Sequence, residues 1–76
     1  MEKYFYVEIE EDISRTLSPF IVEHQEIMLA ANEEMIIADL LHRFGKHLVT
    51  FSIDEIAEDD ERMKSANIYV VPLREG

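Results

Sequence analysis

Residues Asn32 to Gly45, NEEMIIADLLHRFG, decide the fold, because they carry the beginning, the period and the end of one helix. Asn32 can accept hydrogen bonds from the first free backbone N–H groups. Glu33 and Glu34 follow where negative charge meets the positive end of the helix dipole. Gly45 suits the left-handed position just past the last turn. The sequence therefore predicts a helix between Asn32 and Gly45.

The predicted helix has one apolar side, whose residues recur at the spacing of helical turns. These residues are Ile36, Ile37, Leu40, Leu41 and Phe44. Asp39 and Arg43 are four residues apart, so we expect them to form an ion pair on the solvent side. A helix this short is marginal alone, so its apolar side is expected to rest on a sheet built by the flanking segments.

Two segments alternate between apolar and polar residues, which is typical of half-buried strands. In Lys3 to Glu10, KYFYVEIE, the apolar positions are Phe5, Val7 and Ile9, and the other face carries Tyr4, Tyr6, Glu8 and Glu10. In residues 46–53, KHLVTFSI, one face carries Val49, Phe51 and Ile53. Both segments are predicted to be strands.

A third strand is expected at the end of the chain. Residues 67–74, NIYVVPLR, are almost wholly apolar, which suits a strand that is covered on both faces. Pro72 cannot donate to a strand ladder, so either the pairing weakens near the end or the strand lies at an edge there.

Residues 19–31, PFIVEHQEIMLAA, are ambiguous. As a helix, the segment would be capped by Ser18 and would begin with Pro19 in the first helical position. As a strand, it alternates in two opposite phases, which implies a bulge or turn near residues 24–26. The β-branched pair Ile21 and Val22, and the immediate start of the next helix, favour the strand.

Two acidic segments join these elements. Residues 11–18, EDISRTLS, are expected to form a polar connection. Residues 54–66, DEIAEDDERMKSA, carry six acids in their first eight positions and are expected to form either a short, mostly exposed helix or an ordered loop. Ser52, followed three residues later by Glu55, resembles a capping box for such a helix.

The predicted order is strand, strand, helix, strand, acidic segment and strand, in a single domain of residues 1–76. This predicts an α+β fold of two layers, with a four-stranded sheet packed on one main helix. The layout resembles the ubiquitin-like β-grasp family, including its closing apolar strand, here NIYVVPLREG. The resemblance implies a β-grasp fold and an adaptor or assembly role. Conjugated and sulfur-carrier members of that family end in two glycines, whereas this chain ends in Glu75 and Gly76.

Charge limits the partners of this protein. Seventeen acidic and seven basic residues give a net charge of −10, which disfavours direct binding to nucleic acid or to an anionic membrane. A basic protein surface would be attracted, although surplus acid also serves solubility alone. The chain has no cysteine, no signal-peptide pattern and no apolar run longer than five residues, so a cytoplasmic location is expected.

No set of residues predicts catalysis, a cofactor or a metal. The two glycines leave no phosphate-binding loop, and no nucleophile–base pair can be named. Among the three histidines, His42 and His47 flank the helix end, where Glu23 or Glu26 could be a further ligand. Zinc sites usually show tighter, repeated spacing, so we expect no metal and no enzyme activity.

Two functions from different classes are consistent with these features. The first is an inhibitor whose carboxylates imitate nucleic acid and occupy a basic groove of a partner, of the kind that nucleic-acid-binding proteins have. In composition the chain is similar to phage-encoded DNA mimics and anti-CRISPR proteins, which are also short, acidic and cysteine-free. The second is a ubiquitin-like adaptor that binds through its sheet face, where Tyr4 and Tyr6 lie. A homodimer in which the last strand pairs edge to edge is a third possibility.

The candidate partner-binding residues therefore form two acidic groups and one aromatic pair. They are Glu8, Glu10, Glu11 and Asp12; Asp54, Glu55, Glu58, Asp59, Asp60 and Glu61; and Tyr4 and Tyr6.

Overall fold

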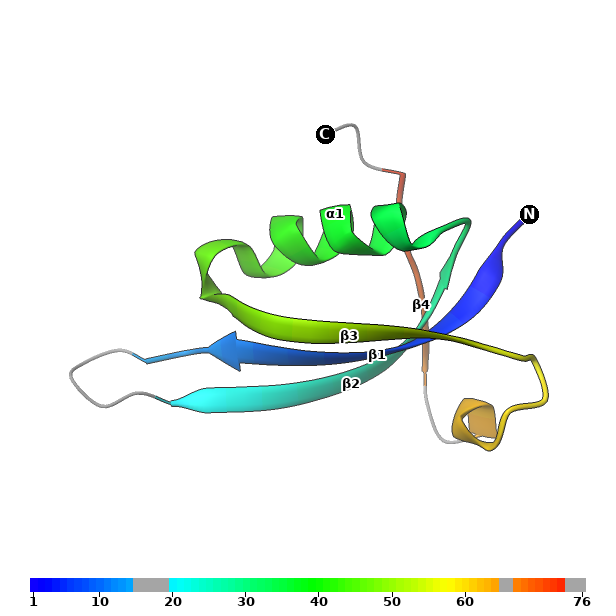
Figure 1. The fold of residues 1–76 in the computed structure, drawn as a ribbon, viewed down its shortest axis with the longest axis horizontal. Helices are drawn as coiled ribbons and strands as arrows, with labels where there is room; N and C mark the ends of the chain where they lie inside the picture. Colours follow the sequence, from blue (N-terminus) through cyan, green and yellow to red (C-terminus); the bar gives the residue numbers. More distant parts are fainter. Residues whose placement is uncertain (15–19, 65–66, 74–76) are drawn as a thin grey trace.

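A computed structural model describes residues 1–14, 20–64 and 67–73 and shows one α-helix lying over a four-stranded sheet (Figure 1). In chain order, the elements are β1 (Lys3–Asp12), β2 (Ile21–Ala30), α1 (Glu33–Phe44), the 3₁₀ turn η1 (Gly45–His47), β3 (Leu48–Ile56), the 3₁₀ turn η2 (Glu61–Lys64) and β4 (Ile68–Val70). This confirms the predicted α+β class and the predicted order of strands and helix. The Ser18 cap and the Pro19 helix start fall outside the described residues.

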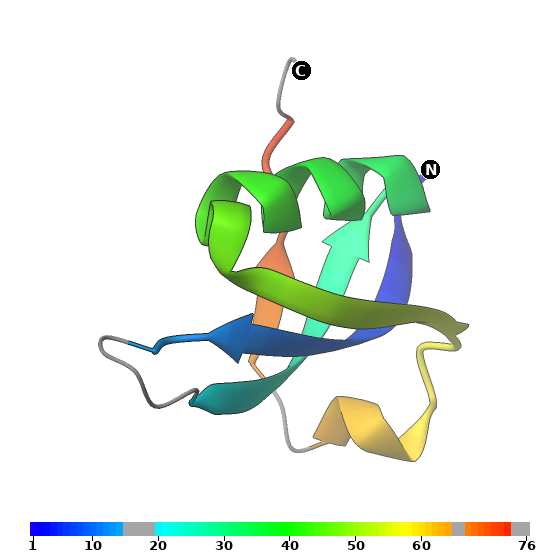
Figure 2. The same ribbon diagram turned by 60° about the vertical axis from the view of Figure 1, so that its left-hand side comes forward.

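The strands lie in the order β3-β1-β2-β4, so β1 and β2 form the middle of the sheet. β1 runs antiparallel to both of its neighbours, whereas β4 runs parallel to β2 at the edge. Figure 2 shows α1 crossing one face of this sheet, while η2 lies near the opposite face. The closing strand thus lies beside β2.

The ends of α1 are built as the sequence predicts. The Asn32 side chain accepts a hydrogen bond from the Met35 backbone nitrogen at 3.0 Å. Gly45 has a positive φ of 56°, and its N–H donates to the Leu41 carbonyl. A residue with a Cβ would be strained in that conformation, so glycine ends the helix and turns the chain towards β3.

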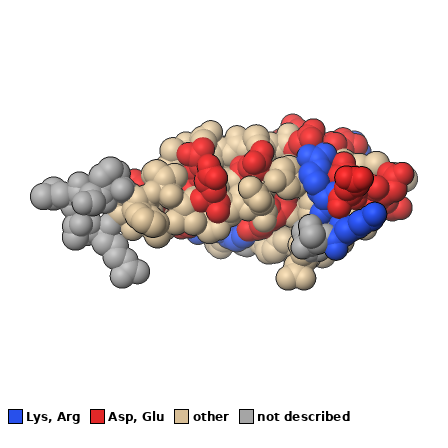
Figure 3. Space-filling view, turned by 90° about the horizontal axis from the view of Figure 1, so that it is seen from below, with Lys and Arg blue, Asp and Glu red and all other residues tan. Residues whose placement is uncertain are grey.

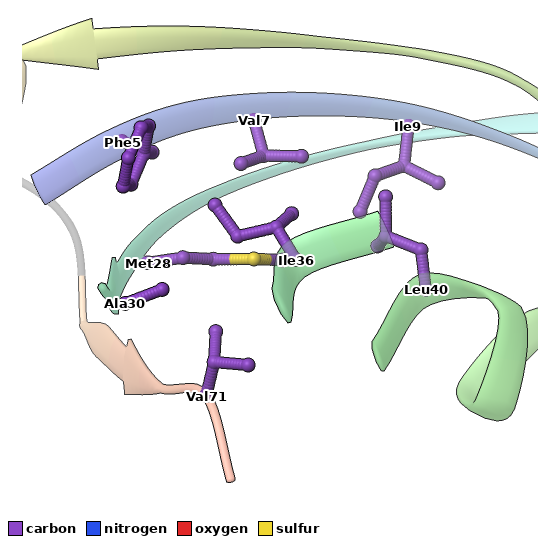
Figure 4. Packing of buried hydrophobic residues seen from close by; sticks show 8 residues of the cluster. All are labelled: Phe5, Val7, Ile9, Met28, Ala30, Ile36, Leu40 and Val71. Carbon is purple, nitrogen blue, oxygen red and sulfur yellow. The ribbon is translucent and has the colours of Figure 1, made fainter. Parts of the chain in front are cut away.

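The core lies between α1 and the face of the sheet that α1 covers (Figure 4). Phe5, Val7 and Ile9 point into it from β1, as their alternation predicts. The other buried members of this cluster are Met28, Ala30, Ile36, Leu40 and Val71. Burial of these side chains supplies most of the drive to fold, at roughly 1.5–3 kcal/mol for each large one.

The buried side of α1 differs from the predicted one. Its buried residues are Ile36, Asp39 and Leu40, whereas Leu41 is 55% exposed. The Asp39–Arg43 ion pair forms at 2.9 Å, but Asp39 is fully buried, so the predicted solvent-side position is wrong. Hydrophobic periodicity misses this, because it counts a carboxylate as a surface residue.

Asp39 is tolerated in the core because polar groups surround it. Arg43 Nε donates to Asp39 Oδ2 at 2.9 Å, and the Tyr69 hydroxyl donates to Asp39 Oδ1 at 3.1 Å. Arg43 also donates two hydrogen bonds to the Glu26 carboxylate, at 3.2 and 3.0 Å. The guanidinium lies 4.3 Å from the centre of the Tyr69 ring. We call these four residues the Asp39 cluster; it joins α1 to β2 and β4.

The pKa of Arg43 reflects this environment. Partial burial alone would lower it, but hydrogen bonds and charge from Glu26 and Asp39 outweigh burial and raise it above its ordinary value. Arg43 is therefore charged at every pH at which the protein folds, and Asp39 keeps its cationic neighbour.

Residues 21–30 form a strand, which decides the ambiguity of this segment against the helix. Its register with β1 is continuous, from Lys3 opposite Ala30 to Asp12 opposite Ile21, so the predicted bulge in it is wrong. The change of phase has another cause: Ile27 and Met28 point to opposite faces, and both are buried.

The sheet does contain a bulge, but it lies where β1 pairs with β3. Glu10 pairs with Thr50 and Glu11 with Leu48, which leaves Val49 as the extra residue of β3. Val49 is consequently 51% exposed and does not share the buried face predicted for it.

Two predictions for the C-terminal half are corrected. β3 continues to Ile56, so residues 52–55 are strand and the predicted capping box does not form. β4 is a short edge strand in which Ile68 is 42% and Val70 is 60% exposed, so it is not covered on both faces. The edge position agrees with the alternative that Pro72 suggests.

The Asp39 cluster generates a stability prediction. We expect Arg43→Met to lower the free energy of unfolding by about 3 kcal/mol, because it removes the arginine that donates a hydrogen bond to a buried carboxylate. The double variant Asp39→Leu with Arg43→Met should recover most of this loss, since an apolar pair of similar volume needs no partner. Urea denaturation measures both. Equal stability of the single variant and the wild type would contradict the prediction.

Candidate functional site

The face of the sheet away from α1, which we call the open face, carries carboxylates of the first predicted group. Tyr4, Tyr6, Glu8 and Glu10 point to this face, opposite the buried residues of β1. Figure 3 looks onto this side of the molecule and shows acidic side chains both in its middle and at one end, where most of the visible lysine and arginine side chains also lie. The alternation of β1 therefore places Glu8 and Glu10 as predicted.

Glu23 of β2 joins this group and was not among the predicted site residues. It lies directly opposite Glu10 in the β1–β2 register. The Leu29 carbonyl accepts a hydrogen bond from the Val71 N–H, so the backbone groups of Leu29 point away from β1 and towards β4. Every second residue of a strand points the same way, so the backbone N–H and C=O of Glu23 also point away from β1. Glu10 and Glu23 thus form a non-hydrogen-bonded pair, the kind in which side chains lie closest. Sequence reasoning missed Glu23 because it left residues 19–31 between helix and strand.

The three carboxylates of Glu8, Glu10 and Glu23 have no ion-pair partner in the part of the chain that the structure describes. They border a shallow hollow of about 210 Å³. The other polar residues that line it are His24, Gln25, Thr50 and Ser52. We call Glu8, Glu10 and Glu23 the acidic triplet. Like charges placed directly across a sheet are destabilising, by roughly 0.2–1 kcal/mol.

Glu11 and Asp12 are not part of the triplet. Glu11 Oε1 lies 2.9 Å from Nε2 of His24. The centre of the His24 ring lies 5.7 Å from the centre of the Phe44 ring. Asp12 accepts a hydrogen bond from the Ser14 backbone nitrogen at 2.8 Å, and its bonds to Ser14 lower the pKa of this carboxyl. These two predicted site residues hold local structure.

The second predicted group, residues 54–61, is partly neutralised. Glu55 lies 3.6 Å from Lys3 Nζ, and Arg62 contacts both Asp54, at 3.4 Å, and Asp60, at 2.9 Å. Glu58, Asp59 and Glu61 are exposed and have no ion pair with any described residue. Cations therefore collect at this end of the sheet and not at the acidic triplet.

The predicted aromatic pair is only partly available. Tyr4 and Tyr6 are both half-buried. The Arg62 guanidinium lies 4.8 Å from the centre of the Tyr6 ring, where its Asp60 and Asp54 contacts hold it. Tyr6 thus packs against Arg62 of η2.

A larger groove of about 680 Å³ lies where β4 begins beside β2. An arginine and a tyrosine pair on each side of it: Arg43 with Tyr69, and Arg62 with Tyr6. Gln25, Glu26, Ile27, Asn67 and Ile68 complete the lining. Both guanidiniums are already bound to carboxylates, so the groove offers no uncompensated positive charge.

Neither a metal site nor a membrane helix is found within residues 1–14, 20–64 and 67–73. No group of three or more His, Asp or Glu side chains there is arranged to hold a metal ion. No helix in the same ranges is long and apolar enough to cross a bilayer.

Comparison of the chain with protein-family models, with curated proteins and with solved structures finds no match. The resemblance to the β-grasp family therefore stays a prediction.

The Asp60–Arg62 pair generates a titration prediction. Hydrogen bonds from the Arg62 side chain and backbone lower the pKa of Asp60 from 3.8 to about 2. Because the folded pKa is the lower one, the stability gained from ionised Asp60 is present above pH 3.8 and is lost as the pH falls towards 2. NMR titration of the side-chain carboxyl carbon should show this midpoint. In Arg62→Gln the midpoint should move up towards 3.8, and an unchanged midpoint would contradict the pairing.

Proposed function

We propose that this protein is a non-catalytic binding module that docks the open face of its sheet onto a basic surface of another protein. The acidic triplet is the contact that sets the charge of that partner. A surface that binds nucleic acid has the required positive charge, so the protein would act as an inhibitor that occupies such a surface.

The placement of Glu10 opposite Glu23 is the observation that carries this proposal. Solubility requires acidic residues somewhere on the surface, but it does not require two of them at directly opposed positions. That arrangement costs stability, and no described lysine or arginine offsets it. A basic partner would remove the repulsion on binding, so the strain favours association over the free state.

The adaptor hypothesis uses the same face in a different way. It assigns the contact to Tyr4 and Tyr6, whose rings are half-buried. The triplet is the more accessible feature, since Glu8 and Glu23 are exposed. We therefore place charge, not aromatic packing, at the centre of the proposed interface.

A capture experiment with matched variants tests the proposal. The immobilised protein should retain a basic protein from lysate at about 50 mM salt and release most of it at about 200 mM, because charge-driven contacts weaken steeply with salt. Duplex DNA added in excess should displace the captured protein if its basic surface is a nucleic-acid groove.

Matched variants separate the triplet from net charge. Glu8→Gln, Glu10→Gln and Glu23→Gln together should lower retention by roughly tenfold or more, because they remove the proposed contact. Glu58→Gln, Asp59→Asn and Glu61→Gln raise the net charge by the same three units and should retain most of the binding. Equal loss in both variants would show that only net charge matters, and would overturn the proposed surface.

The same face generates a stability prediction. Glu23→Gln removes the like charge opposite Glu10, so the free energy of unfolding should rise by about 0.5 kcal/mol. Glu58→Gln is the control, since Glu58 is exposed in a turn and no described cation pairs with it. Urea denaturation at low salt compares the two. A loss of stability in Glu23→Gln would contradict the repulsion inferred from the register.

A further inference from the structure

Most of the outer edge of β2 has no strand beside it within the described residues. β4 pairs with β2 only at Ile27, Met28 and Leu29, so no strand of the described chain lies beside residues 21–26. By the alternation set at Leu29, the backbone N–H and C=O groups of Ile21, Glu23 and Gln25 point outward from this edge. Six residues of strand span about 20 Å.

This edge lacks proline and a bulge, two devices that block pairing at a strand edge, and its charged side chains, Glu23 and Glu26, are both acidic. Residues 21–26, IVEHQE, contain no proline, glycine, lysine or arginine, and their pairing with β1 has no bulge. The other free edge of the sheet, on β3, is different. Val49 bulges there, and Lys3 and Arg62 neutralise Glu55 and Asp54. The outer edge of β4 is only three residues long, so the β2 edge is the longer described edge without a bulge.

We propose that an extended, basic segment of a partner protein adds to the sheet as a fifth strand beside residues 21–26 of β2. This inference rests on the proposed function and names the part of the partner that binds. Its backbone would pair with the outward groups of Glu23 and Gln25. The end of the partner segment that lies beside Gln25 would reach the 680 Å³ groove where β4 begins.

The two sides of the edge determine which side chains the segment carries. On the open face, an added residue beside Glu23 also faces the triplet, so lysine or arginine fits there. On the α1 side, its neighbours are Val22, His24 and Glu26; His24 is already bound to Glu11, and Glu26 to Arg43. Apolar residues fit that side. The favoured segment therefore alternates basic and apolar residues.

A second copy of this chain is the poorer occupant of the edge. Each chain carries a net charge of −10, and pairing two β2 edges would bring their Glu23 side chains near each other. Long-range attraction favours a basic segment instead.

The experiment uses two synthetic probes, a seven-residue peptide of alternating lysine and valine and its glutamate–valine counterpart. Binding to the ¹⁵N-labelled full chain is followed by NMR at low salt. The basic peptide should shift the amides of residues 21–26 and slow hydrogen exchange at Glu23 and Gln25 by roughly tenfold or more, because new ladder bonds protect them. The acidic peptide should do neither. Absence of shifts at residues 21–26 with the basic peptide overturns the inference.

Charge variants test the recognition side. Glu23→Lys should raise the Kd of the basic peptide by about tenfold or more, whereas Asp59→Lys makes the same change of charge in the turn before η2 and should raise it less than about threefold. Equal effects would place the peptide elsewhere and overturn the inference.

Backbone variants separate strand addition from docking by side chains. Gln25→Pro removes an outward N–H that β1 does not use, so the fold should persist and peptide binding should fall by about tenfold. Methylating alternate backbone nitrogens of the peptide removes its donors without touching the protein, and should have the same effect. If the methylated peptide binds as tightly as the parent, strand addition is wrong, although docking through the acidic triplet would still stand.

Discussion

The buried carboxylate of Asp39 is the constraint on which the rest of the structure depends. It occupies a core position on α1, where a charge without compensation would cost several kcal/mol. Arg43 and Tyr69 therefore have to stay beside it, and Arg43 in turn holds Glu26. Three elements far apart in the sequence are joined by one set of hydrogen bonds. Apolar packing alone could slide by a residue, but this cluster fixes the register of α1 over the sheet.

The same constraint shapes the surface that remains for binding. Tyr69 is the central residue of β4, so its bond to Asp39 fixes the short strand against the Ile27–Leu29 part of β2. β4 begins only at Ile68, and no other described strand lies beside the preceding part of β2. Arg43 and Arg62 flank the groove at this junction, each bound to acids on its own side of the sheet. The contacts that stabilise the fold thus hold these two arginines at other carboxylates and not at the acidic triplet.

The sequence predicts those features that depend on local patterns. Asn32 and Gly45 mark the ends of α1, and the alternation of β1 places Phe5 in the core and Glu8 on the open face. The features that it misses depend on long-range pairing. Asp39 looks like a surface residue until Tyr69, thirty positions later, is placed beside it. Glu23 becomes part of the triplet only through its register with β1, which no local pattern reveals.

The distribution of charge carries more information than its total. Neutralisation is selective: Lys3 and Arg62 serve the acids of β3 and the following turn, and Arg43 serves Asp39 and Glu26. Of the remaining carboxylates of β1 and β2, Glu10 and Glu23 lie directly opposite each other, and Glu8 lies opposite Gln25. Such an arrangement lowers the stability of a domain that is already small, since a 76-residue chain has only a few kcal/mol of stability to lose. A surface that is unfavourable for the isolated chain becomes favourable when a cationic strand lies beside it, because one contact then removes the repulsion and satisfies the free backbone groups of β2. In the proposed complex, stability and binding would draw on the same residues in opposite directions, as a trade-off between stability and function predicts.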